Sequence, residues 1–172
     1  MRRGELCSPA GPTRKRMRLK NYDYSSKGAY FVTICIKDRS HMLGAVRMDE
    51  LFSLTPHMQL SLIGEVVETE MNRLSRIYDH IYLDSYVIMP NHIHMIICIG
   101  SIDGRAQLAP TPTLSHIIQQ WKGVVTKKIG RPIWQKGFHE HIIRNEADYL
   151  SIAQYIENNA LLWEGDCYNN NS

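Results

Sequence analysis

Apolar positions along the chain follow two different spacings, and each change of spacing marks a boundary between predicted elements. Runs rich in β-branched and aromatic residues, such as Tyr30 to Ile36, predict strands. Apolar residues that recur every three or four positions, as between Leu62 and Leu74, predict amphipathic helices. The elements expected on this basis are a strand over Ala29–Ile36, a loop over Lys37–Ser53, a helix from Thr55 to about Tyr78, two strands joined at Pro90-Asn91, a helix from Leu114 to about Ile129, short strands at Ile133-Trp134 and Phe138–Ile143, and a helix from the N-cap Asn145 to about Leu161.

The order of these elements predicts the fold. A hairpin between two helices, with single strands outside them, is the split βαβ pattern of ferredoxin-like domains. We therefore expect an α+β fold with a four-stranded antiparallel sheet, two main helices on one face and an additional C-terminal helix. Residues 21–165 would form a single domain between a flexible arm, residues 1–20, and a disordered tail, residues 166–172.

Length and composition favour one soluble domain. A chain of 172 residues with 44% hydrophobic residues can bury one full core. Its apolar runs have the length of strands and are too short to cross a membrane, and its basic start lacks the apolar core of a secretory signal. Widely spaced cysteines indicate free thiols in a reducing compartment, so we expect a cytoplasmic protein. These cysteines are Cys7, Cys35, Cys98 and Cys167.

The positive charge is concentrated at the N-terminus. Seven of the 20 lysines and arginines lie in the first twenty positions, where Glu5 is the sole acid. The remainder of the chain carries 13 basic and 16 acidic residues, so its net charge is −3 although the whole chain has +3. A basic arm on a weakly acidic body is typical of proteins that contact nucleic acid, and it is equally compatible with a solubilising segment.

Two histidines at the start of a hydrophobic strand are the first candidates for chemistry. His92 and His94 follow the Pro90-Asn91 turn, and side chains two apart on a strand share one face. Such a pair suits a single metal ion between two imidazoles. Packing of the strand gives no reason for two aligned histidines, although satisfied surface histidines with this spacing also occur.

The last helix carries a second pair of polar residues. Its buried stripe is predicted to consist of Tyr149, Ile152, Ala153, Ile156 and Ala160, from 100° per residue. Tyr155 and Asn159 lie on the border of that stripe, with Ser151 one turn earlier. A side chain on such a border can be anchored and still reach a cleft, or it can simply be a tyrosine at the edge of the core.

Several motifs together resemble one family. The chain is similar to the single-tyrosine transposases of the HUH superfamily, and most of all to the REP-associated tyrosine transposases. The resemblance covers roughly residues 14–163, and the order of the motifs supports it as much as their identity. These motifs are Tyr22–Ser25, Gly28–Cys35, Met89–His94, Trp134–Phe138, His141–Arg144 and Gln154–Asn159.

The resemblance implies an activity and a site. Tyr155 would be the nucleophile that forms a 5′-phosphotyrosine link to a nicked DNA strand, and His92, His94 and Asn159 would bind Mg²⁺ or Mn²⁺. An asparagine oxygen is a hard donor that suits these ions. His141 would line the site. Ala160 departs from the family pattern, which has proline there, and this change concerns the end of the helix rather than the ligand.

The implied partner is single-stranded or hairpin DNA with REP-like repeats, bound by a monomer or a homodimer in the cytoplasm, in association with the nucleoid. A flexible basic arm can enter a groove, and tyrosines can stack on unpaired bases. The residues expected to contact DNA are Arg14, Lys15, Arg16, Arg18, Tyr22, Lys122 and Arg144.

Two other functions fit the same residues. The pairs His92/His94 and His139/His141 could bind Zn²⁺ in a hydrolase that has no covalent step. Alternatively, the chain could be a non-catalytic DNA-binding remnant that keeps the fold. The sequence does not give the DNA sequence recognised, the metal used in the cell or the oligomeric state, nor whether the tyrosine serves its own chain or a partner.

Overall fold

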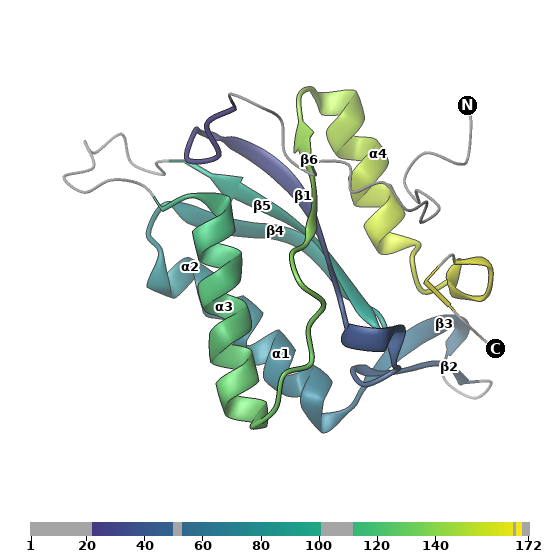
Figure 1. The fold of residues 1–172 in the computed structure, drawn as a ribbon. Helices are drawn as coiled ribbons and strands as arrows, with labels where there is room; N and C mark the ends of the chain where they lie inside the picture. The colour runs from purple at the N-terminus through teal and green to yellow at the C-terminus, as the bar shows by residue number, and fades with distance from the viewer. Residues whose placement is uncertain (1–21, 50–52, 101–111, 167, 170–172) are drawn as a thin grey trace, which may run out of the picture.

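A computed structural model describes residues 22–49, 53–100, 112–166, 168 and 169 (Figure 1). The predicted basic arm, residues 1–20, lies outside this part of the chain. The elements are β1 (Gly28–Cys35), the 3₁₀ helix η1 (Lys37–Arg39), β2 (Gly44–Asp49), β3 (Ser53–Leu60), α1 (Leu62–Asn72), α2 (Leu74–Ile77), β4 (Ile81–Ile88), β5 (His92–Ile99), α3 (Leu114–Ile129), β6 (His139–Ile143), α4 (Glu146–Glu157) and the 3₁₀ helix η2 (Trp163–Gly165).

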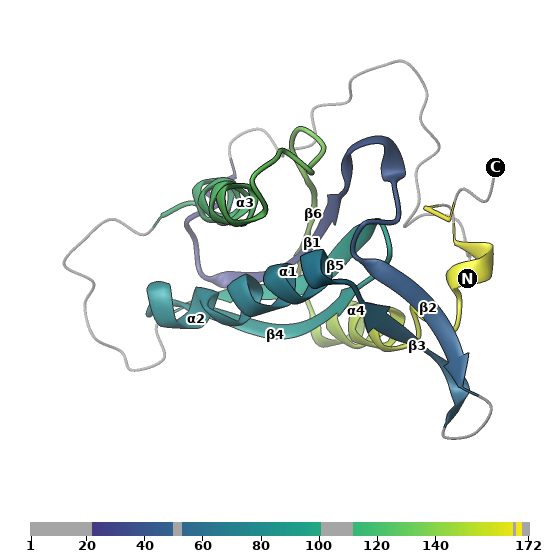
Figure 2. The same cartoon turned by 90° about the horizontal axis from the view of Figure 1, so that it is seen from below.

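The main sheet confirms the predicted ferredoxin-like topology. Its four strands are antiparallel and run in the order β4-β5-β1-β6, so the strand with the histidines is an inner one. In the register of β1 and β5, Cys35 pairs with His92 and Thr33 with His94. Helices α1 and α3 pack against each other on one side of this sheet, and Figure 2 shows α4 on the opposite side.

Two separate apolar cores result from the alternation of side chains along the strands. The larger core lies between the sheet and helices α1 and α3, and it includes Val32, Ile34 and Met95. The smaller one lies beneath α4 and contains Phe31, Ile96, Ile152 and Ile156. The histidines of β5 share the second face, so α4 is the helix that covers them.

The region before α1 differs from the prediction. In place of a loop over Lys37–Ser53 and a helix from Thr55, the chain forms η1 and a two-stranded hairpin of β2 and β3. The residues of β3 alternate between exposed and half-buried from Thr55 to Leu60, which is the spacing of a strand. The helix begins only after Ser61, whose hydroxyl accepts a hydrogen bond from the Gly64 N–H at 3.1 Å.

Capping residues set the limits of the other helices. Helix α3 ends at Ile129, before Gly130 as predicted, and Gly130 caps it in the left-handed conformation with φ 80°. Asn145 caps α4 as predicted, since its side-chain oxygen accepts from the Asp148 N–H at 2.9 Å. However, α4 ends at Glu157 rather than near Leu161, so Asn159 lies beyond the regular helix.

The segment before β6 also differs from the prediction. Trp134 forms only an isolated bridge with Ile36, so Ile133-Trp134 is not a strand, whereas the predicted strand to Ile143 exists as β6. Within the described residues, no helix is both long and apolar enough to cross a membrane.

Candidate active site

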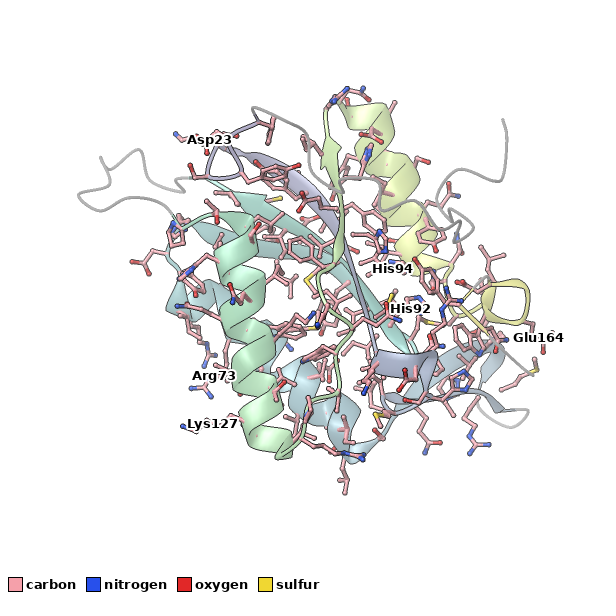
Figure 3. The ribbon with its side chains drawn as sticks, viewed as in Figure 1. Asp23, Arg73, His92, His94, Lys127 and Glu164 are labelled. Carbon is pink, nitrogen blue, oxygen red and sulfur yellow. The ribbon has the colours of Figure 1, made fainter. Side chains whose placement is uncertain are left out.

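His92 and His94 lie side by side under the C-terminal part of α4 (Figure 3). Both side chains are buried, and their ring centroids are 4.5 Å apart. The shared face predicted from their spacing is therefore confirmed. Burial of two neighbouring imidazoles disfavours their protonation, because neither ring can be hydrated as a cation.

The surroundings of His92 leave one ring nitrogen without a partner. Its Nδ1 is 2.9 Å from Asn91 Oδ1, whereas no described residue hydrogen-bonds to its buried Nε2. The rings of Tyr168 and Trp163 pack around it, with centroids 4.5 and 5.9 Å away. Burial, followed by the proximity of His94 and Arg39, lowers the pKa of His92 well below its ordinary value. His92 is thus neutral, with a free nitrogen facing inward.

His94 is held between two hydroxyl groups. Its Nδ1 lies 2.8 Å from Thr33 Oγ1, and its Nε2 lies 3.2 Å from the Tyr155 hydroxyl. Phe31 stacks on the ring with a centroid distance of 5.3 Å. Burial lowers the pKa of His94 to about 3. This imidazole can therefore accept a hydrogen bond, and it is not a cation at neutral pH.

Tyr155 is anchored on α4 with its hydroxyl directed at the histidine pair. Its ring packs edge-on against Phe31, with centroids 6.2 Å apart. Burial raises the pKa of Tyr155 to about 12, the Asp166 carboxylate adds to this effect, and the Asn159 amide opposes it slightly without reaching standard hydrogen-bond geometry. The hydroxyl therefore keeps its proton at neutral pH, and it can donate to His94.

Asn159 is the least satisfied polar side chain in this region. It is fully buried, and neither Oδ1 nor Nδ2 has a hydrogen-bond partner among the described residues. Buried polar groups are paired in the great majority of cases, so the unpaired Asn159 amide and the unpaired His92 Nε2 both need an explanation. A bound cation would satisfy Asn159 Oδ1 and His92 Nε2, because each of these atoms offers a lone pair, whereas Asn159 Nδ2 can only donate.

The donor set fits a hard or borderline divalent ion. Two imidazoles and an amide oxygen suit Mn²⁺ or Mg²⁺ better than they suit a thiolate-seeking metal. No cluster of three or more His, Cys, Asp or Glu side chains placed to hold a metal occurs in the described part of the chain. A three-ligand site here consequently depends on Asn159.

The second histidine pair does not join the first. His139 and His141 are exposed on β6, and β1 separates that strand from β5. Thr33 pairs with His94 on one side and with His139 on the other, so those two histidines are about 10 Å apart across the sheet. His141 Nε2 instead contacts the Asp148 carboxylate at 2.9 Å. The four-histidine zinc site is therefore not assembled.

The residues expected to contact DNA have varied surroundings. Arg14, Lys15, Arg16 and Arg18 lie outside the described residues. Tyr22 packs against other tyrosines, and its hydroxyl is 3.2 Å from that of Tyr30. The Lys122 ammonium donates to the carbonyl oxygens of Gln135 and Gly137 at 2.6 and 2.8 Å, which ties it to the fold. Arg144 is exposed beside the start of α4 and is the most accessible of the three.

Sequence reasoning missed the contribution of the C-terminal segment. We expected residues 166–172 to be disordered, but Asp166, Tyr168 and Asn169 occupy defined positions. The Tyr168 ring covers His92, and the Tyr168 carbonyl oxygen accepts a hydrogen bond from Asn91 Nδ2 at 2.6 Å. The Arg39 guanidinium lies 5.3 Å from the centroid of the Tyr168 ring. A lone tyrosine in a polar tail is a weak signal, because nothing local indicates what it packs against.

Comparisons with known proteins identify one relative and one shared fold. No protein-family model matches the chain. An uncharacterized protein of Haemophilus influenzae is 33% identical over 171 residues, which cover 89% of this chain and 91% of that protein. A solved structure of a REP-associated tyrosine transposase bound to a REP hairpin is 22% identical and covers 84% of this chain and 72% of that one, with a TM-score of 0.59. The chain therefore belongs to the same family as the Haemophilus influenzae protein, and its fold is that of a REP-associated tyrosine transposase.

Proposed function

We propose that this protein is a transposase that nicks and joins single-stranded or hairpin DNA, with Tyr155 as the nucleophile. The observation that carries the proposal is the 3.2 Å contact between the Tyr155 hydroxyl and His94 Nε2. It unites the two motifs on which the family resemblance depends, the histidine pair of β5 and the tyrosine of α4. The shared fold with a transposase supports the same conclusion.

The covalent step follows from these groups. The Tyr155 hydroxyl oxygen attacks the scissile phosphorus, a tyrosine–phosphate bond forms to the 5′ side, and the bond from phosphorus to the 3′ oxygen breaks. The tyrosine loses one proton and the departing 3′ oxygen gains one, so a free 3′-hydroxyl results. Attack by another 3′-hydroxyl reverses the step, restores a phosphodiester and frees Tyr155.

His94 positions the nucleophile before the reaction. With a neutral imidazole beside it and no ion bound, the Tyr155 hydroxyl donates to Nε2 and is held in one orientation. An ion bound at Nε2 would take that lone pair and leave the hydroxyl free to turn to the phosphate. Its high pKa makes the free hydroxyl a weak nucleophile at pH 7, so activation must come with the substrate or with an ion. His92, His94 and Asn159 would hold Mg²⁺ or Mn²⁺, which supplies Lewis-acid polarisation of the scissile phosphate.

The proposed substrate is DNA that presents a hairpin or a single strand. A REP hairpin is the DNA bound in the transposase structure that shares this fold. The basic arm, with Arg14, Lys15, Arg16 and Arg18, would contribute phosphate contacts beside the site. Because Tyr155 reaches His94 within one chain, we propose that a monomer is sufficient for cleavage. Action on chromosomal repeats would place the protein in the cytoplasm, at the nucleoid.

Covalent trapping on a labelled REP-type hairpin tests the proposal. The full-length protein should form an adduct that resists denaturation, requires Mn²⁺ or Mg²⁺ and is absent after EDTA treatment. Tyr155→Phe should abolish the adduct and retain hairpin binding. Tyr149→Phe is the matched control, because this tyrosine lies on the same helix but its hydroxyl donates to Asp84 at 2.5 Å, away from the histidines.

The two other functions give different outcomes in the same assay. A hydrolase would cut the DNA without an adduct and would tolerate Tyr155→Phe. A DNA-binding remnant would shift the hairpin in a gel and would leave it uncut whether Mn²⁺ or Mg²⁺ is added. An adduct that persists in Tyr155→Phe would show that the nucleophile is another residue.

A further inference from the structure

The side chain of Asn91 forms hydrogen bonds with three different segments. Its Nδ2 is 3.0 Å from the Arg39 carbonyl oxygen and 2.6 Å from that of Tyr168, while its Oδ1 is 2.9 Å from His92 Nδ1. Asn91 is fully buried, and its own carbonyl accepts from the Ile36 N–H at 2.8 Å. The residue is therefore fixed on its main chain and its side chain alike.

These partners determine which end of the amide faces the histidine. Carbonyl oxygens can only accept hydrogen bonds, so the group that faces Arg39 and Tyr168 must be the NH₂. The remaining group, Oδ1, can only accept, and it faces His92 Nδ1. That nitrogen must therefore carry the proton of the neutral imidazole. The lone pair of His92 is then on Nε2, the buried atom that has no partner among the described residues.

We propose that Asn91 is a positioning residue that presets His92 as a metal ligand by holding its imidazole in the Nδ1–H tautomer. The inference rests on the proposed function for the identity of the ligand that Nε2 meets, a divalent cation. A ligand whose tautomer is already correct need not exchange a proton before binding. Groups that fix a metal-binding histidine in this way commonly change metal affinity 10- to 100-fold when they are removed.

The two histidines of the pair differ in this respect. His94 lies between the hydroxyls of Thr33 and Tyr155, and a hydroxyl can donate or accept. Both tautomers of His94 are therefore satisfied, and the ring can change tautomer when Tyr155 turns to a substrate. His92 has no such freedom, because an amide oxygen cannot donate. The structure thus assigns a fixed role to His92 and an adaptable one to His94.

Nitrogen NMR on the metal-free, full-length protein with ¹⁵N-labelled histidine tests the assignment directly. Wild-type His92 should show a protonated Nδ1 and an unprotonated Nε2 at neutral pH. Asn91→Leu, which removes the acceptor, should convert His92 to a mixture of tautomers or to Nε2–H. Asn91→Asp retains an acceptor at the same place and should keep Nδ1–H, although it loses both donated bonds.

Thr33→Val is the reciprocal control, since Thr33 contacts His94 and not His92. It should change the signals of His94 and leave the tautomer of His92 as in the wild type. If Asn91→Leu proves too unstable to study, the wild-type spectrum still decides the matter. Wild-type His92 with a protonated Nε2 would overturn the proposal, and so would an unchanged tautomer in a folded Asn91→Leu variant.

Mn²⁺ titration of the same proteins provides the second measurement. Asn91→Leu should bind Mn²⁺ about 10- to 100-fold more weakly than the wild type, and Asn91→Asp should not show this loss. Equal affinities of Asn91→Leu and the wild type would contradict the presetting role. Neither the NMR spectrum nor the Mn²⁺ titration needs DNA or catalysis. Failure to form an adduct would therefore reject the proposed function and leave the tautomer of His92 as a separate result. Conversely, an active transposase with His92 as Nε2–H would reject this inference alone.

Discussion

Replacing Asn159 with leucine separates two effects of this side chain. One is the loss of folding stability from an unpaired buried amide, and the other is the contribution of its oxygen to metal binding. The side chain is fully buried, and both of its polar groups are without hydrogen bonds. Each buried polar group left unpaired costs about 1–3 kcal/mol. Leucine has a similar branched shape and no polar atoms, so Asn159→Leu should remove this cost. Allowing for imperfect fit, we expect the metal-free protein to gain about 1–3 kcal/mol in its free energy of unfolding.

Thermal unfolding with and without Mn²⁺ measures both effects. In a chain of this size, 1 kcal/mol shifts Tm by about 2–4 °C, so the metal-free variant should melt several degrees above the wild type. Mn²⁺ at a hundred times its Kd should stabilise the wild type by about 2.7 kcal/mol. The variant should gain little, because its third ligand is absent. Asn158→Leu, at the neighbouring position, serves as the control and should keep the response to Mn²⁺.

The reasoning would be refuted by either of two results. If Asn159→Leu destabilised the metal-free protein by more than 1 kcal/mol, the amide would have favourable partners that the structure does not contain. If the variant kept the full stabilisation by Mn²⁺, Asn159 would not be a ligand. In that case the ion would bind through the histidines and other groups.

Three further predictions concern the framework and the DNA. Asn145→Ala removes the cap of α4 and should cost about 1 kcal/mol, seen as a Tm lower by about 2–4 °C in calorimetry; an unchanged Tm would show that the cap is dispensable. Glu70 accepts from Lys128 and Arg73, and these bonds hold the pKa of its carboxyl below the ordinary 4.5. The carboxylate should therefore make the wild type more stable than Glu70→Gln at pH 7, and urea titrations should show the difference disappearing as the pH falls below about 4.5. A stability difference between the wild type and Glu70→Gln that persisted at acid pH would show that the ionised carboxylate is not its cause. Replacing the arginines and lysine at 14, 15, 16 and 18 with alanine should reduce the salt dependence of hairpin binding, lowering the slope of log K against log salt by about 3, and an unchanged slope would show that the arm does not meet phosphate.

The sequence was sufficient for the elements whose signals are local and strong. Strand β5 combines an apolar run with histidines two apart, and both features depend only on neighbouring residues. Helix α4 has an asparagine cap and a clear stripe, so its start and its buried face were predicted correctly. The order of elements then determined the ferredoxin-like topology, because few arrangements accommodate a hairpin between two helices.

What the sequence could not give depends on contacts between distant segments. The hairpin of β2 and β3 was missed because the helix indicated by the apolar spacing from Leu62 onward was extended back to Thr55, although residues 55–60 alternate as in a strand. Tyr168 meets His92 across more than seventy residues of sequence, and the hydrogen bonds of Asn91 to Arg39 and Tyr168 span 52 and 77 residues. No periodicity in the sequence encodes such contacts.

The central claim is that Tyr155 becomes covalently attached to DNA, and peptide mass spectrometry of the trapped adduct tests it most directly. The protein is incubated with a hairpin and Mn²⁺, digested with nuclease and protease, and searched for a peptide that carries a nucleotide on tyrosine. We predict that the modified peptide contains Tyr155, within the sequence Gln154 to Asn159, and that Tyr168 is unmodified. A nucleotide on Tyr168 or on any other side chain, or cleaved DNA with no modified peptide, would contradict the account.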